Sequence, residues 1–79
     1  MMKKKEDTEK RLRMAIKQVL GKVTRANSPA VYHFIHKDNG KLDTGGYNRM
    51  ETLIVQKVIA TGIGIEAVIP QIEDELNMM

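Results

Sequence analysis

Apolar residues recur at helical spacing between positions 12 and 23, and this pattern constrains the fold more than any other feature of the chain. They stand at i, i+3, i+4, i+7, i+8 and i+11, which places them on one face of an α-helix. They are Leu12, Ala15, Ile16, Val19, Leu20 and Val23. With Asp7 or Thr8 as the N-cap, we predict an amphipathic helix over residues 8–23 whose apolar face needs other helices to cover it.

The segment that follows has two interpretations. A Ser-Pro pair at 28–29 is typical of a helix start and an Asn-Gly pair at 39–40 of a helix end, which together predict a short helix over residues 29–38. The alternative is a β-hairpin near residues 31–44. We favour the helix, because the returning strand of the hairpin would be short and poorly apolar.

Two further helices are predicted in the second half of the chain. Asn48 is the first residue of a capping-box pattern and predicts a helix over residues 49–61, after a glycine-rich loop at 41–47. A second apolar stripe predicts a helix over residues 66–77. Pro70 interrupts this stripe, so the helix either starts close to it or bends there.

Length and composition limit the architecture to one small domain. A chain of 79 residues, 42% of them hydrophobic and none of them cysteine, has room for one thin core and has no disulfide to brace it. We therefore expect residues 1–79 to form an all-α bundle of three to four short helices, with residues 1–5 as a flexible basic tail. The alternative is an α+β fold that contains the hairpin.

No segment is predicted to cross a membrane. The longest apolar-rich stretch, residues 53–69, is interrupted by Gln56, Lys57 and Glu66 and contains two glycines. The basic start of the sequence lacks the apolar run of a secretory signal. We therefore expect a cytoplasmic protein.

Charge is distributed unevenly along the chain. Residues 1–25 carry nine Lys or Arg against three acids, whereas residues 51–79 carry one against five. The basic segment is a candidate for nucleic-acid binding, because Lys and Arg neutralise phosphates. It is also compatible with an anionic membrane surface, with attraction to the acidic end of the chain, or with an ordinary solvated helix face. The candidate nucleic-acid-binding residues are Lys10, Arg11, Arg13, Lys17, Lys22 and Arg25. Since no aromatic residue is interleaved with them, base stacking is not expected from this helix.

Two other surfaces are candidates for binding. The predicted helices at 49–61 and 66–77 offer more apolar surface than a small domain readily covers, which favours a homo-oligomer or docking on a protein partner. The candidate self-association residues are Leu53, Val55, Ile59, Ile65, Ile69 and Ile72. Glycines before a helix can present backbone N–H groups to an anion, and the candidate anion-binding residues are Thr44, Gly45, Gly46 and Arg49.

No catalytic or metal-binding set is recognisable in the sequence. Ser28 is the only serine and is better explained as a helix cap than as a nucleophile. His33 and His36 could face one metal ion from a helix, but no third ligand has a suitable spacing. We therefore expect no enzymatic activity, no cofactor and no metal. The leading expectation is a non-enzymatic interaction or regulatory protein that self-associates or docks on a partner protein, and the alternative is nucleic-acid binding through the basic helix.

Overall fold

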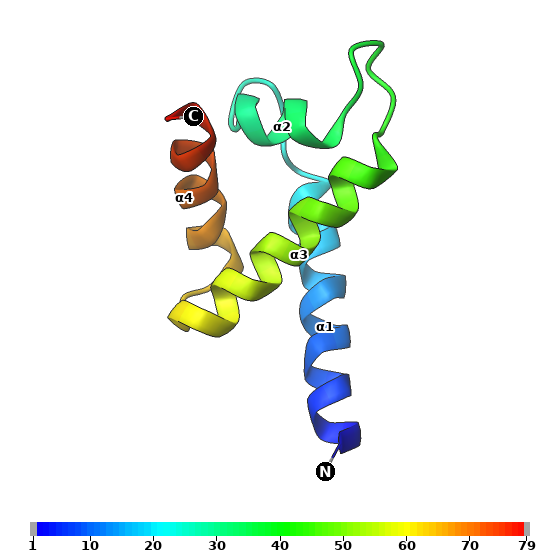
Figure 1. Cartoon of the computed structure of the whole chain (residues 1–79), viewed down its shortest axis with the longest axis vertical. Coiled ribbons are helices and arrows are strands. Elements are labelled where there is room, and N and C mark those ends of the chain that lie inside the picture. The colour runs from blue at the N-terminus through cyan, green and yellow to red at the C-terminus, as the bar shows by residue number, and fades with distance from the viewer. Residues whose placement is uncertain (1, 79) are drawn as a thin grey trace.

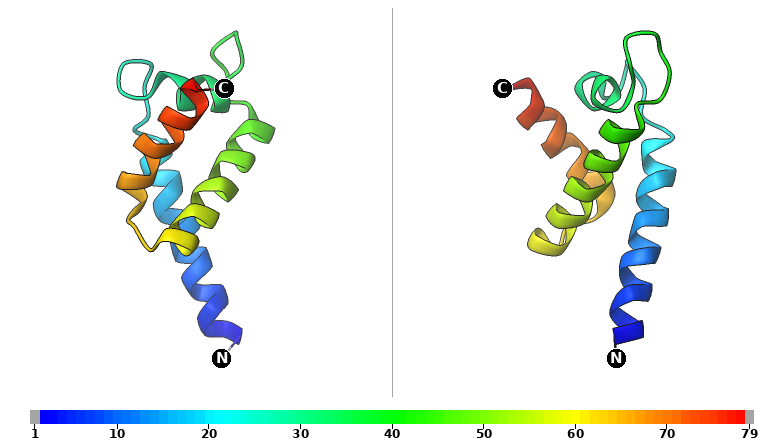
Figure 2. Two further views of the ribbon diagram at one scale, coloured as in Figure 1. Left: turned by 60° about the vertical axis from the view of Figure 1, so that its left-hand side comes forward. Right: turned by 45° about the vertical axis from the view of Figure 1, so that its right-hand side comes forward.

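The computed structural model describes residues 2–78 of the chain, with side chains from residue 8 onward. This part contains four helices: α1 (Met2–Leu20), α2 (Pro29–Ile35), α3 (Thr44–Thr61) and α4 (Ile65–Asn77) (Figure 1). No β-strand is present within it, so the predicted all-α bundle is confirmed. The α1, α3 and α4 helices each pack against the other two, and α2 lies across one end of the bundle (Figure 2).

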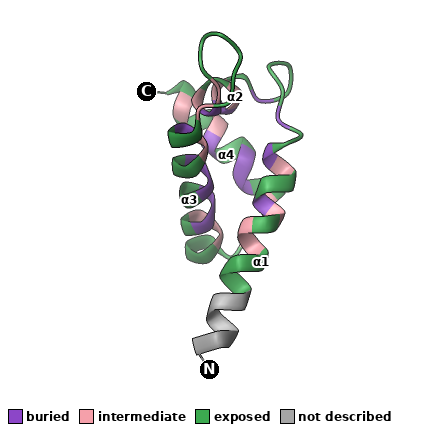
Figure 3. Ribbon diagram, turned by 90° about the vertical axis from the view of Figure 1, so that its right-hand side faces the viewer, coloured by how far each residue is buried: buried purple, intermediate pink, exposed green. Residues whose placement is uncertain are grey.

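The core takes residues from all four helices, and each predicted apolar stripe contributes to it. Ile16, Val31, Ile54 and Val68 are completely buried and come from α1, α2, α3 and α4 in turn. The buried sides of α1 and α3 face each other in Figure 3. Removal of these side chains from water is the main favourable contribution to folding. The other buried apolar residues are Leu20, Val23, Ile35, Met50, Val55, Ile69 and Ile72.

The first helix is shifted towards the N-terminus relative to the prediction. It begins at Met2 rather than at Thr8, and it ends at Leu20 rather than at Val23. A turn at Gly21 follows, which agrees with the low helix propensity of glycine. Val23 is nevertheless buried, so the apolar stripe continues beyond the helix. The flexibility predicted for residues 1–5 lies outside the residues whose side chains the structure describes.

The second segment combines features of both interpretations. The predicted helix is present, but it ends at Ile35 and not at residue 38. His36 and Leu42 then form an isolated antiparallel bridge. The turn between them is closed by a hydrogen bond from the Lys37 N–H to the Lys41 carbonyl oxygen at 2.7 Å. A short helix followed by a tight turn therefore replaces both the longer helix and the full hairpin.

The third helix begins within the segment that was predicted as a loop. It starts at Thr44 with Asp43, rather than Asn48, as its N-cap. Asp43 Oδ1 accepts a hydrogen bond from the Gly46 N–H at 3.2 Å, which satisfies one of the free donors at the helix start. A Cβ atom at Gly46 would overlap the backbone carbonyl oxygen of Phe34. Gly46 is therefore needed for the close approach of α3 to α2, and not for a flexible loop.

The fourth helix begins at Ile65, one residue before the predicted start. The turn that precedes it depends on Gly62, which adopts the left-handed conformation with φ of 72°. The Gly62 N–H donates to the Val58 carbonyl oxygen at 2.8 Å and so ends α3. Pro70 lies inside α4, and the helix continues through it to Asn77.

Candidate functional site

Arg13 joins α1 to α3 through a buried carboxylate. Its Nη1 donates to Glu51 Oε1 at 2.9 Å, and its Nε donates to Oε1 of Glu9, one turn away on α1, at 3.3 Å. The Glu51 side chain is only 7% exposed, whereas that of Arg13 is 35% exposed. The hydrogen bond with Glu51 raises the pKa of the Arg13 guanidinium. Arg13 therefore serves helix packing and is not a free cation.

The surroundings of Glu51 make this carboxylate dependent on Arg13. Its second oxygen, Oε2, is buried and accepts no hydrogen bond within the described part of the chain. Burial raises the pKa of the Tyr47 hydroxyl, and the charge of Glu51 raises it further. A buried carboxylate with one unpaired oxygen is costly unless a cation compensates it.

Glu73 of α4 caps the start of α2 with its side chain. Its Oε2 and Oε1 accept hydrogen bonds from the N–H groups of Ala30 and Val31, each at 2.9 Å, and Asn77 Nδ2 donates to Oε2 at 3.1 Å. Burial opposes ionisation of Glu73, but these three hydrogen bonds outweigh it and lower the pKa of the carboxyl. Ser28, which was expected to cap this helix, makes no cap bond with its side chain. The Glu73 side chain, and not that of Ser28, therefore caps α2.

Glu73→Gln is expected to lower the free energy of unfolding by about 1–2 kcal/mol at neutral pH, because a neutral amide oxygen binds a helix N-terminus more weakly. Because folding lowers the pKa of Glu73, the carboxylate stabilises the folded protein fully at a pH above the ordinary glutamate pKa of about 4.3. This stabilisation is lost as the pH falls through the lower pKa that Glu73 has in the folded protein. Urea denaturation should show a smaller difference between the two proteins at about pH 3 than at neutral pH. An equal difference at both pH values would contradict this explanation. Exposed Asp74, substituted as Asp74→Asn, is the matched control and should have little effect.

Among the side chains that the structure describes, hydrogen bonds and ion pairs engage a larger share of the acids than of the cations. Besides Glu9, Glu51 and Glu73, Asp43 caps α3, and Glu75 pairs with Lys57. Within residues 8–78, ion pairs engage only two cations, Arg13 and Lys57. The cations of this part without an acidic partner are Lys10, Arg11, Lys17, Lys22, Arg25, Lys37, Lys41 and Arg49.

Most of these unpaired cations gather on the outer side of α1 and the turn after it. We call Lys10, Arg11, Lys17, Lys22 and Arg25 the basic surface, and all of them are exposed. At 3.6 residues per turn, the first three lie within about a third of a turn of α1, opposite buried Ile16, and Lys22 and Arg25 follow the helix. In the described part of the chain, no ion pair joins this surface to the acidic helix α4. The exposed cations of the basic surface can therefore contact an anionic partner.

An aromatic stack adjoins the basic surface, and sequence analysis did not identify it. The rings of Tyr32 and His36 are stacked with centroids 4.0 Å apart and an angle of 16° between their planes. The Arg25 guanidinium carbon lies 5.3 Å from the centroid of the Tyr32 ring. The i, i+4 spacing of the two rings was a visible signal of their contact. The contact of Arg25 with Tyr32 depends on the turn after α1, and helical periodicity does not predict the path of a turn.

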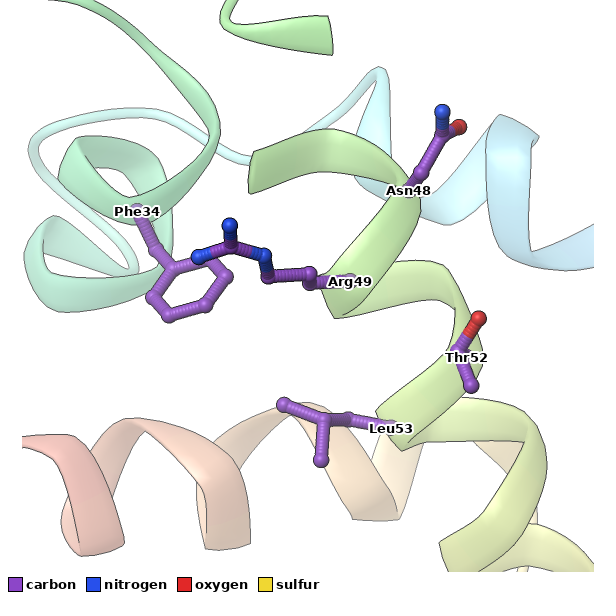
Figure 4. Close-up of a pocket in the computed structure, with 5 residues that line it drawn as sticks. All are labelled: Phe34, Asn48, Arg49, Thr52 and Leu53. Carbon is purple, nitrogen blue, oxygen red and sulfur yellow. The ribbon is translucent and has the colours of Figure 1, made fainter. Parts of the chain in front are cut away.

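The candidate anion-binding residues are not arranged as one site. The Gly46 N–H is already bonded to Asp43, whose negative charge occupies the helix start, and Gly46 is buried. Thr44 and Gly45 are exposed there. Arg49 instead lies along an open groove of about 430 Å³ and points towards Phe34 (Figure 4). The groove is lined by Phe34, Asn48, Arg49, Thr52 and Leu53.

Half of the candidate self-association residues belong to the core of the chain itself. Val55, Ile69 and Ile72 are buried among the helices, and Ile65 is half-buried. Leu53 is 38% exposed and Ile59 is 70% exposed. These two residues are six positions apart on α3, which puts them roughly a third of a turn from each other. The exposed members therefore do not form one continuous patch.

The described residues hold no group of three His, Cys, Asp or Glu side chains placed to bind a metal ion. His36 follows α2 and stacks on Tyr32, and His33 meets the edge of the same tyrosine ring. None of the helices in this part of the chain is by itself both long and apolar enough to span a bilayer. The pair α3 and α4 meets that test only jointly, across a bend of 114°.

Comparison with known proteins found no match for this chain. No family model matches it, and neither a curated protein nor a solved structure is significantly similar to it. Its function has to be inferred from its own residues.

Proposed function

We propose that this protein is a non-enzymatic nucleic-acid-binding protein that holds the phosphate backbone on the basic surface. The supporting observation concerns residues 8–78, in which most acids are engaged in hydrogen bonds or ion pairs while the cations of the basic surface have no acidic partner. Unpaired Lys and Arg on one face release counterions when they contact phosphates. This release favours binding without preference for sequence.

Self-association or docking on a protein partner, the leading expectation from sequence, ranks second. Three of its six candidate residues lie in the core, and exposed Leu53 and Ile59 are separated around α3. Isolated exposed apolar residues are common on monomeric proteins. A cationic helix face without partners is thus the stronger indication of what the molecule binds.

Neutralising Lys10, Lys17 and Lys22 together to glutamine is expected to weaken binding to a labelled mixed-sequence duplex by at least about tenfold at low salt. The slope of log affinity against log salt should become shallower by about 2–3, since each lost phosphate contact removes nearly one unit. Fluorescence anisotropy titrations at several salt concentrations measure both quantities. Arg13 is left unchanged in this variant, because its loss would disturb the pair with Glu51.

The matched control lowers the net charge by the same amount at positions outside the basic surface. Gln56→Glu, Ala67→Glu and Gln71→Glu lie at exposed positions of α3 and α4, and the combined variant should keep most of the affinity. Equal weakening by both triple variants would show that only net charge matters and would reject the basic surface as the site. If the unaltered protein binds neither duplex nor single strand at low salt, the proposed function fails, and a protein partner becomes the better hypothesis.

A further inference from the structure

The Tyr32–His36 stack is held in place before any ligand arrives. His36 Nδ1 is 2.9 Å from the Tyr32 carbonyl oxygen, which fixes the imidazole against the tyrosine ring. Both side chains are half-buried, so part of each remains accessible. A rigid aromatic pair at the surface loses little conformational freedom when a further flat group stacks on it.

The loop that carries Arg25 is also ordered by its own side chains. The Thr24 N–H donates to Asn27 Oδ1 at 2.9 Å, and the Asn27 N–H donates to Thr24 Oγ1 at 3.1 Å. Asn27 Nδ2 further donates to the Lys22 carbonyl oxygen at 3.0 Å, which ties the loop to the end of α1. Arg25 therefore reaches Tyr32 from a loop closed by three hydrogen bonds, and it links the stack to the basic surface.

Two further cations, Lys37 and Lys41, follow the stack in the chain. Lys37 is next to His36, and the bond from its N–H to the Lys41 carbonyl oxygen brings the two ends of the turn together. Both lysines are exposed and have no acidic partner in the described part of the chain. Aromatic rings beside a track of positive charge are the arrangement that binds single-stranded nucleic acid, in which bases stack and phosphates pair with cations.

We propose that the Tyr32–His36 stack binds an unpaired nucleobase, while Arg25 and the basic surface hold the adjoining phosphates. This inference rests on the proposed function and adds to it a preference for single strands. A duplex keeps its bases paired and stacked on one another, so it offers only phosphates to this region. A single strand offers both phosphates and a free base face.

Tyrosine fluorescence provides a direct test, because the chain has two tyrosines and no tryptophan. In a Tyr47→Phe protein, Tyr32 is the only tyrosine, and a base that stacks on its ring in place of the Arg25 guanidinium should quench the emission. Titration with an oligothymidylate is expected to quench it, whereas an abasic strand of equal length and charge should bind without quenching. Anisotropy of the labelled strands shows binding independently. A bound oligothymidylate that leaves the emission unchanged would overturn the proposal.

Substitution of Tyr32 tests the energetic contribution of the ring. Tyr32→Leu keeps an apolar side chain against the core and is expected to weaken oligothymidylate binding by about tenfold, with no change for the abasic strand. Tyr32→Phe keeps the aromatic face and should bind like the unaltered protein. Equal weakening for both strands would assign Tyr32 a purely structural role and reject the inference. If Tyr32→Leu does not fold, the fluorescence titration of the Tyr47→Phe protein still tests whether a base stacks on Tyr32.

Phosphate binding and base stacking can be tested separately. Equal affinity of the unaltered protein for the oligothymidylate and the abasic strand would leave phosphate binding intact and remove only the base platform. Absence of binding to either strand at low salt would remove the proposed function, and the platform with it.

Discussion

Gly46→Ala is expected to lower the free energy of unfolding by about 3 kcal/mol or more, because the added methyl group has no room. Its Cβ would overlap the carbonyl oxygen of Phe34, which is backbone and cannot rotate away as a side chain can. Either α3 separates from the end of α2 or its first turn unwinds, with loss of the Asp43 cap. For a domain of this length the total stability is about 4–12 kcal/mol, so the loss is a large fraction of it.

Gly45→Ala is the matched control for this prediction. A Cβ at Gly45 would lie 3.6 Å from Asp43 Oδ1, an ordinary van der Waals distance, and Gly45 is exposed in the same helical turn. Since alanine favours the helix over glycine, this variant should be as stable as the unaltered protein or more stable by up to about 1 kcal/mol. Urea denaturation followed by far-UV circular dichroism compares the two variants. Equal free energies of unfolding for the two variants would mean that Gly46 is not in tight contact with Phe34.

Arg13→Met is expected to destabilise the protein by roughly 3 kcal/mol, since it leaves the buried Glu51 carboxylate without its cation. Because Arg13 is partly exposed, water can solvate the site after the substitution, so the expected loss of stability lies at the low end of the range for breaking a buried ion pair. Arg13→Lys retains a cation and should cost less, although lysine cannot bond to Glu51 and Glu9 with the same geometry.

A double-mutant cycle separates the pair from the packing around it. The combined variant Arg13→Met and Glu51→Met replaces both charges by apolar side chains and should be more stable than Arg13→Met alone. Glu51→Met alone leaves Arg13 partly exposed and still paired with Glu9, so its cost should be smaller than that of Arg13→Met. Simple additivity of the two single effects in the urea midpoints would contradict coupling between the residues.

These stability effects decide how the proposed function has to be tested. Arg13 stood among the candidate nucleic-acid-binding residues, but its substitution would weaken the fold and lower apparent binding for that reason. Lys10, Lys17 and Lys22 make no ion pair within residues 8–78, so their neutralisation breaks none of the ion pairs that join the helices. A change in the salt dependence with unchanged stability can then be assigned to lost phosphate contacts.

Local patterns along the chain predicted the helices because helical periodicity is a property of consecutive residues. The stripe around Ile16 marked α1, and the stripe around Ile69 marked α4, with errors confined to their ends. The sequence also showed that α1 is basic, since the number of charged residues in a segment does not depend on the tertiary structure.

The tertiary structure decided which of these residues remain available. Whether Arg13 is free depends on Glu51, which comes 38 positions later in the chain. Gly46 marks a contact and not a loop because Phe34 lies against it. Arg25 acquires an aromatic neighbour only where the turn after α1 meets α2. The physical reason is the same in each case: periodicity acts within one helix, whereas ion pairs, close contacts and ring stacking depend on which helices meet.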